Sequence, residues 1–177
     1  RVFNGPIAED YILGTANGMS RFRDDIRIVV DGAELAADFW PAMEQYLECS
    51  HDYWRSNGAF APNITIRLAS GGYIGGGLYH SQNLEGNLAG LPGVRIVCPS
   101  FADDAAGLLR TAMRSEGPTL YLEPKALYNN KDAMTVVPDD FEVPFGKARV
   151  RREGSDLTVL TYGNTTHLCL KAAEELA

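Results

Sequence analysis

The segment from Val94 to Leu122 determines the predicted fold class; it reads V-R-I-V-C-P-S-F-A-D-D-A-A-G-L-L-R-T-A-M-R-S-E-G-P-T-L-Y-L. Its two ends are short runs of branched and aromatic side chains, which are typical of buried strands. Between them apolar side chains recur at helical spacing, and Ser100 with Asp103 three positions later resembles a capping box. A strand, a helix and a second strand in succession, with both strands almost continuously apolar, indicate a parallel sheet.

The same patterns continue on both sides of this segment. They predict further strands at residues 26–30, 63–69 and 156–161, and helices at residues 6–22, 36–54, 84–91 and 165–177. Residues 125–140 are polar and predict a loop, and residues 141–150 predict irregular β structure. The predicted fold class is therefore α/β, a mostly parallel sheet covered by helices, followed by the start of a second α/β unit. We expect residues 1–145 to form the first domain and residues 146–177 to begin the second.

Composition narrows the class of protein. The 177 residues carry a formal net charge of −7, which argues against a nucleic-acid or anionic-membrane surface. No apolar run approaches the roughly 18 residues that a membrane span requires. Three widely spaced cysteines in apolar surroundings indicate reduced thiols and a reducing compartment such as the cytoplasm. The chain starts without methionine and ends within a helical pattern, so we expect a fragment.

A glycine-rich stretch, S-G-G-Y-I-G-G-G-L-Y-H-S-Q, follows the predicted strand at residues 63–69 and ends near a histidine, His80. A dinucleotide-binding loop requires G-x-G-x-x-G, and from Gly75 the third glycine would fall on His80. A P-loop requires Lys and then Ser or Thr after its last glycine, but Leu78 follows Gly77. The stretch therefore predicts positive φ angles and a close approach of another group, not a phosphate cradle.

His80 is the candidate functional residue of this loop, because ligands of α/β sheets bind beyond the carboxyl ends of the strands. We expect it to face a cleft there. Two interpretations stay open on the residues alone: a ligand-side histidine, or a packed histidine in a tight crossover. No histidine has companions at metal-ligand spacing, and no serine or cysteine lies in a nucleophile-elbow motif. The segment Glu123-Pro124-Lys125 is equally open between a rigid turn after a strand and a substrate-side role.

Seven motifs occur in order between residues 1 and 128: R-V-F-N-G-P-I-A-E, P-A-M-E-Q, I-T-I-R, L-Y-H-S-Q, P-G-V-R-I-V-C-P-S, A-A-G-L-L-R-T-A and L-E-P-K-A-L-Y. Together they resemble the β subunit of the thiamin-diphosphate-dependent 2-oxo acid dehydrogenases, the decarboxylating component of the pyruvate and branched-chain complexes. The similarity continues through G-S-D-L-T-V-L-T-Y-G at residues 154–163. L-Y-H-S-Q together with L-E-P-K resembles the branched-chain type more than the pyruvate type.

The resemblance implies a transketolase-like pyrimidine-binding domain with thiamin diphosphate as cofactor. In that family an α subunit supplies the diphosphate and magnesium site, and two α and two β subunits assemble. The acyl group passes to a lipoyl domain of a dihydrolipoamide acyltransferase core. The implied partners are therefore the α subunit and this core, in the cytoplasm or, in a eukaryote, the mitochondrial matrix.

The resemblance also implies site residues. His80 matches the active-site histidine of the family, in the same H-S-Q context, and Glu34 lies at a cofactor-contact position. An aromatic residue that stacks near the pyrimidine corresponds to Asp38, unless Phe39 takes that role by a local shift. Some members bind potassium partly through backbone carbonyls, and Ile64 and Thr65 match ligand positions of that ion.

Two departures from the family pattern bear on these expectations. Ser115 and Gly117 replace an aspartate and an asparagine that several members have in the potassium region; carbonyl ligation tolerates such changes. The glutamate that contacts the aminopyrimidine ring lies upstream of the R-V-F motif, so we expect it outside residues 1–177. Two alternatives follow: another transketolase-like thiamin enzyme, or a non-catalytic interaction domain that keeps the fold. A sugar-phosphate transketolase would need phosphate-binding basic residues and a fused diphosphate domain, which this sequence does not display.

Overall fold

The computed structural model describes residues 1–32 and 35–177, and its centre is a four-stranded parallel sheet. The strands are β1 (Ile28–Asp31), β2 (Ile64–Ser70), β3 (Arg95–Val97) and β4 (Thr119–Pro124), in the spatial order β1-β2-β4-β3. β2 and β4 form the middle of the sheet, where Ile66 lies opposite Leu120. The predicted α/β class with a parallel sheet is confirmed, and four predicted strands lie within a few residues of their expected positions.

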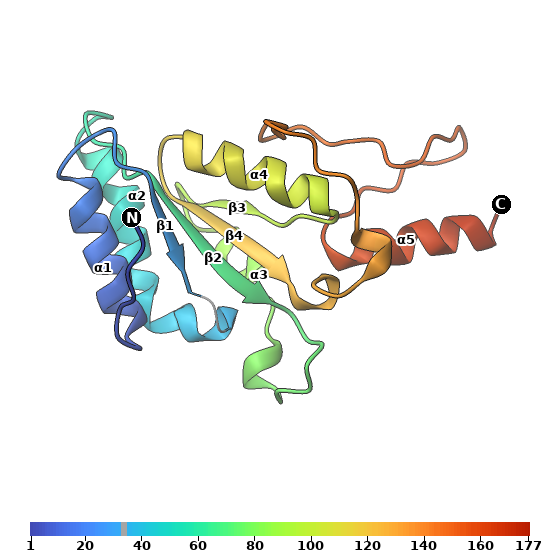
Figure 1. The fold of residues 1–177 in the computed structure, drawn as a ribbon, viewed down its shortest axis with the longest axis horizontal. Coiled ribbons are helices and arrows are strands. Elements are labelled where there is room, and N and C mark those ends of the chain that lie inside the picture. Colours follow the sequence, from blue (N-terminus) through green and yellow to red (C-terminus); the bar gives the residue numbers. More distant parts are fainter. Residues whose placement is uncertain (33–34) are drawn as a thin grey trace.

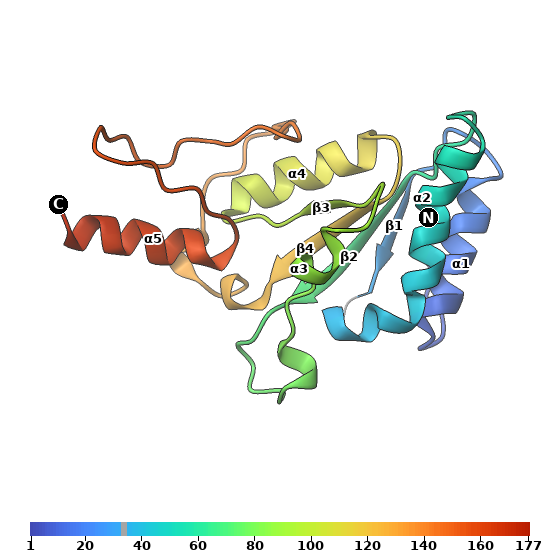
Figure 2. The ribbon, with the colours of Figure 1, turned by 180° about the vertical axis from the view of Figure 1, so that it is seen from behind.

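The main hydrophobic core lies on one face of this sheet. Two helices, α1 (Glu9–Ser20) and α2 (Met43–Arg55), pack there with the short α3 (Glu85–Leu88), as Figures 1 and 2 show from opposite sides. The core is formed by side chains that are almost fully buried: Leu13, Tyr46, Cys49, Ile64, Ile66, Leu68, Leu84, Leu88, Leu120 and Leu122. Alternation along β2 and β4 directs these residues to one face, because successive strand side chains point to opposite sides.

A single long helix, α4 (Ala102–Arg114), covers part of the opposite face above β3 and β4 (Figure 1). The hydroxyl of Tyr121 on β4 donates to the carbonyl of Ala105 at 2.6 Å and ties the helix to the sheet. The predicted capping box at its start is wrong. Phe101 occupies the N-cap position without a side-chain hydrogen bond, and the Ser100 hydroxyl instead bonds to that of Thr166 at 2.9 Å.

The C-terminal part of the chain contains one helix, α5 (Asn164–Glu175), which extends away from the sheet (Figure 1). The predicted strand at residues 156–161 and the irregular β structure at residues 141–150 are both wrong, since neither range contains strand residues. A strand needs a neighbour for its backbone N–H and C=O groups, and no described strand lies beside these residues. Leu157 and Leu160 are accordingly 75% and 85% exposed.

The remaining helical turns are short 3-10 segments that follow strands or loops. They are η1 (Ala36–Ala42), η2 (Tyr79–Ser81), η3 (Lys125–Leu127) and η4 (Lys131–Ala133). η1 runs directly into α2, so the helix predicted at residues 36–54 is present, but its first part is a tighter 3-10 turn that contains Pro41. Among the described residues, no helix has both the length and the apolar character to cross a bilayer.

Two arginines in the segment after residue 148 form ion pairs with the start of α4. Arg149 lies 2.9 Å from a carboxylate oxygen of Asp103, and Arg151 lies 3.1 Å from the other. Burial would raise the pKa of Asp103, but hydrogen bonds from Arg151 and Arg149 outweigh it, and the pKa is lowered. The N–H of Asp103 donates to the hydroxyl of Thr135 at 2.9 Å, so a residue far along the chain caps the helix.

We expect these ion pairs of Asp103 to make the free energy of unfolding depend on pH in the acid range. A carboxylate whose pKa is lowered on folding contributes stability above its unfolded pKa, about 3.9, and that contribution is lost as the pH falls through the folded value. Asp103→Asn should therefore lower the free energy of unfolding by about 1 kcal/mol near neutral pH, and the difference should vanish well below about pH 4. Thermal unfolding across this range measures both, with the exposed Asp139→Asn as control. A deficit of Asp103→Asn that persists unchanged at low pH would contradict the role of the charge.

Candidate functional site

The candidate site lies at the edge where the carboxyl ends of three parallel strands meet. η1 is the first described helical segment after β1 in the chain. The glycine-rich loop and η2 follow β2, and η3 follows β4. The loop projects beyond the arrowhead of β2, away from the body of the sheet (Figures 1 and 2). Segments far apart in the sequence therefore come together at the edge where α/β sheets bind ligands.

The glycine loop has the backbone that its sequence predicts. Gly75 and Gly77 have φ angles of 73° and 74°, in the region that favours glycine, so the expected positive φ is confirmed. Gly76 is needed for a different reason: a Cβ there would lie 2.9 Å from the Cβ of His80. The loop thus brings its own backbone against the histidine, and the Ser81 hydroxyl closes the turn by donating to the carbonyl of Gly77 at 2.7 Å.

We expect Gly76→Ala to displace His80. The added methyl would overlap a backbone-proximal carbon that cannot swing away, at a cost of about 1–3 kcal/mol. Gly72→Ala is the matched control, because its Cβ would lie 3.6 Å from the nearest atom, an ordinary contact. Chemical denaturation and histidine NMR spectra of both variants test this. Unchanged stability together with an unshifted His80 resonance in Gly76→Ala would contradict the close approach.

His80 lies in η2 and is partly exposed, so it is not enclosed in the apolar core. Its ring meets that of Tyr79 edge-on, with ring centroids 5.4 Å apart. Its backbone carbonyl accepts a hydrogen bond of 2.6 Å from the ammonium of Lys125. His80 lines neither of the two cavities described below, and that it faces a cleft stays a prediction.

Segment η1 braces the loop from the other side. The Trp40 indole N–H donates to the side-chain carbonyl of Gln82 at 3.1 Å, and the Tyr79 hydroxyl donates to the carbonyl of Ala37 at 3.4 Å. The residues on both sides of His80 are thereby attached to η1. The aromatic side chains of this region thus hold the loop in place.

The other residues predicted for the cofactor separate in the structure. Asp38 is partly exposed and near the candidate site, whereas Phe39 is 3% exposed and packs edge-to-face on Tyr46 in the core, with ring centroids 5.7 Å apart. Both line a cavity of about 20 Å³, which has room for one water molecule and none for an aromatic ring. Glu34 lies outside the described residues.

Ile64 and Thr65, the predicted potassium ligands, lie at the opposite end of β2 and are each 1% exposed. Near them the Arg95 guanidinium donates to the Ser115 hydroxyl at 2.9 Å and to the hydroxyl of Thr119 at 3.2 Å. At this end of the sheet the Arg95 guanidinium therefore links β3 to β4 and to the residue after α4. In the described part of the chain, no group of three His, Cys, Asp or Glu residues is arranged to hold a metal ion.

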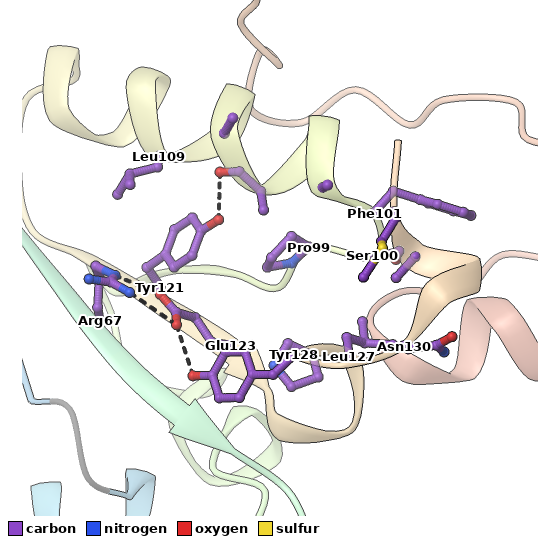
Figure 3. A pocket seen from close by; sticks show the side chains of 16 residues that line it. Arg67, Pro99, Ser100, Phe101, Leu109, Tyr121, Glu123, Leu127, Tyr128 and Asn130 are labelled. Carbon is purple, nitrogen blue, oxygen red and sulfur yellow. Dashed lines mark hydrogen bonds and ion pairs between the residues drawn. The ribbon is translucent and has the colours of Figure 1, made fainter. Parts of the chain in front are cut away.

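A larger cavity of about 390 Å³ lies between α4 and the end of β4 (Figure 3). Its charged wall is the pair of Arg67 and Glu123, with the Arg67 Nε 2.6 Å from a carboxylate oxygen, and the Tyr128 hydroxyl donates to the other oxygen at 2.9 Å. Burial and this hydrogen bond both raise the pKa of Tyr128. Because these groups satisfy one another, the cavity offers an apolar surface but no unpaired acid or base.

The sequence left Glu123-Pro124-Lys125 open between a rigid turn and a substrate-side role. In the structure the side chains of Glu123 and Lys125 lie in different surroundings. Glu123 lines the large cavity, whereas Lys125 is only 4% exposed and bonds to His80. Burial lowers the pKa of Lys125, and the negative charge of Asp38 opposes this effect. The sequence did not indicate the bond between Lys125 and His80, since no spacing relates this side chain to a carbonyl 45 positions earlier.

Comparison with known proteins identifies the fold family. The family model for the transketolase pyrimidine-binding domain matches residues 1–131. The chain belongs to this family. A second model, for the transketolase C-terminal domain, matches residues 146–177, so residues 132–145 lie between the two matches.

Relatives of this transketolase-family chain include β subunits of two enzymes. The chain is 40% identical over 177 residues to 2-oxoisovalerate dehydrogenase subunit beta of Bacillus subtilis, a match that covers 99% of the chain and 53% of that relative. It is 36% identical over 179 residues to pyruvate dehydrogenase E1 component subunit beta of the same organism, with the same coverage. These matches confirm the resemblance read from the motifs. The chain spans about half the length of these curated relatives.

A solved structure has the same transketolase-like fold. It is described as a split gene transketolase, inactive beta4 tetramer, and superimposes with a TM-score of 0.52 over 97% of this chain and 68% of that one. The two sequences are 19% identical, so the likeness concerns the fold alone.

Proposed function

We propose that this chain is the pyrimidine-binding part of a β subunit of a thiamin-diphosphate-dependent 2-oxo acid dehydrogenase. The observation that carries the proposal is the position of His80, on a glycine loop at the carboxyl edge of a parallel sheet, in a chain of this family. The substrate we favour is a branched-chain 2-oxo acid. In support, identity to the 2-oxoisovalerate enzyme subunit is 40%, against 36% to the pyruvate enzyme subunit from the same organism.

The residues present fit one wall of a site for the pyrimidine ring of thiamin diphosphate. From β2 to η2 the loop carries no Asp, Glu, Lys or Arg, and it leaves His80 partly exposed, as contact with a neutral aromatic ring requires. The cavity beside Asp38 is too small for that ring. We propose that a partner supplies the opposite wall. We propose His80 and Asp38 as the residues that face the cofactor, with Glu34 as a further contact. In this proposal Phe39, which lies in the core, supports the neighbouring Asp38.

Thiamin diphosphate, when bound, supplies the reactive carbon that amino-acid side chains lack. In the proposed reaction the 2-oxo acid loses carbon dioxide, and the acyl group is transferred to one sulfur of a lipoyl disulfide while the other sulfur is released. The released sulfur needs a proton, and an imidazole can donate one near neutral pH. We propose that His80 donates this proton.

The partners follow from the same proposal. An α subunit would supply the diphosphate and magnesium site in a heterotetramer of two α and two β subunits, and a lipoyl domain of a dihydrolipoamide acyltransferase core would accept the acyl group. The apolar side chains at the tip of the glycine loop are suited to contact a partner, since Ile74 and Leu78 are 62% and 94% exposed. We also retain a domain boundary after residue 145, and a potassium ion bound by the carbonyls of Ile64 and Thr65, as proposals.

Calorimetric titration tests the division of the cofactor site between two chains. This chain alone, titrated with thiamin diphosphate and magnesium, should bind weakly, because the groups that hold the diphosphate belong to the α subunit. The full-length protein mixed with its α subunit should bind the cofactor and decarboxylate a branched-chain 2-oxo acid. Micromolar binding by the isolated chain would show that it builds its own diphosphate site and would overturn the proposal.

A further inference from the structure

Lys125 is the most deeply buried basic side chain near the candidate site. Only 4% of its surface is exposed, and it lies directly after Pro124 at the carboxyl end of β4. Burying an ammonium is unfavourable unless it is well hydrogen-bonded, and lysine is rarely buried without a partner. An apolar side chain of similar length would avoid this desolvation. The position of the ammonium therefore calls for a role that an apolar residue could not fill.

The ammonium joins two loops that the sheet leaves separate. It donates to the backbone carbonyl of His80 at 2.6 Å, and because the donor is charged this bond is stronger than one between neutral groups. The two residues follow neighbouring strands, since Ser70 at the end of β2 lies opposite Pro124 at the end of β4. The bond thus holds η2 to the stable middle of the sheet.

The loop needs such an anchor because its other hydrogen bonds involve residues before and after residue 80. Its glycines make it conformationally permissive, and its base is closed by the Gly71 N–H, which donates to the Gln82 carbonyl at 3.1 Å. Tyr79 and Gln82 are attached through their side chains to η1. In the described residues, the bond from Lys125 is the one that reaches the backbone of His80 itself.

We propose that Lys125 is a positioning residue for His80: its ammonium fixes the backbone carbonyl of residue 80 and so holds the imidazole at the carboxyl edge of the sheet. The inference rests on the proposed function of His80. Asp38 assists, because its negative charge favours the protonated form of Lys125.

The test uses Lys125→Met, which keeps the length of the side chain and removes the donor, and Lys125→Arg, which keeps a charged donor. Each is made in the full-length protein assembled with its α subunit, with and without His80→Ala. Three quantities are measured: acyl transfer to a lipoyl domain, the dissociation constant of thiamin diphosphate, and the thermal unfolding midpoint of the assembly. Should Lys125→Met fail to assemble, Lys125→Gln, which removes the charge and shortens the side chain, replaces it with the same expected slowing.

We expect Lys125→Met to slow acyl transfer by about tenfold to a hundredfold, since a misplacement of about 1 Å at a reacting group has effects of this size. Cofactor affinity should stay within about twofold, and Lys125→Arg should recover most of the rate. In the His80→Ala background the same substitution should have little further effect, because coupled residues are not additive. A structural role alone would not produce this non-additivity.

Each contrary outcome has its own meaning. If Lys125→Met slows acyl transfer equally with and without His80, or chiefly weakens cofactor binding, then Lys125 does not act through His80 and the inference is wrong. If His80→Ala itself leaves acyl transfer unchanged, the proposed function of His80 fails instead, and the inference fails with it. Normal acyl transfer in Lys125→Met, with His80→Ala impaired, overturns the inference and leaves the proposed function standing.

Discussion

Replacing His80 by alanine in the assembled enzyme should slow acyl transfer to a lipoyl group by about a hundredfold or more, the usual contribution of a positioned acid or base. The thermal unfolding midpoint should change little, because the side chain is partly exposed and outside the core. Cofactor affinity should also change little, because the proposed proton is needed at the sulfur of the acceptor. Decarboxylation measured with an artificial electron acceptor should therefore be affected less than transfer to the lipoyl group.

His51→Ala is the matched control for this prediction. His51 is exposed on α2, far along the chain from the glycine loop, and it has no part in the proposed site. Single-turnover measurements of lipoyl acylation separate the chemical step from binding and product release. Equal rates for the His80→Ala variant and the unchanged enzyme would remove His80 from the mechanism.

The largest effect on stability should come from the centre of the sheet. Leu120 is fully buried on β4, opposite Ile66 on one neighbouring strand and Ile96 on the other. Leu120→Ala would leave a cavity that strands on both sides prevent from closing, and we expect a loss of about 2–5 kcal/mol in the free energy of unfolding. Urea denaturation followed by circular dichroism measures the loss.

Leu160→Ala makes the same chemical change at a site that is 85% exposed. It should alter the free energy of unfolding of this chain by no more than about 0.5 kcal/mol. A loss below about 1 kcal/mol for Leu120→Ala would contradict its place in a tightly packed core.

Local patterns were sufficient for the sheet and for its long helix. The strand at residues 94–98 and the helix after it could be predicted because an apolar run and a 3.6-residue period are properties of neighbouring residues. The positive φ angles of Gly75 and Gly77 were predictable for the same reason. The family could be read from short motifs, and the comparisons with known proteins confirm it.

The errors occurred where a local pattern depends on a distant partner. Residues 156–161 have the composition of a strand but lack a described neighbour to pair with. Ser100 has the spacing of a cap, yet its hydroxyl bonds to Thr166, 66 positions away. Phe39 is a different case: its ring packs on Tyr46 in the core, and its role toward a cofactor stays a prediction.

The sequence by itself determined the class of fold, the family and the identity of His80 as the candidate residue, because each depends on the order and spacing of nearby residues. Only the tertiary structure decided what holds His80 in place. The bond from Lys125 joins residues 45 positions apart, and it exists because parallel strands bring their carboxyl ends to one edge. No local pattern relates two residues so far apart in the sequence. The pairing of β2 with β4 brings them together.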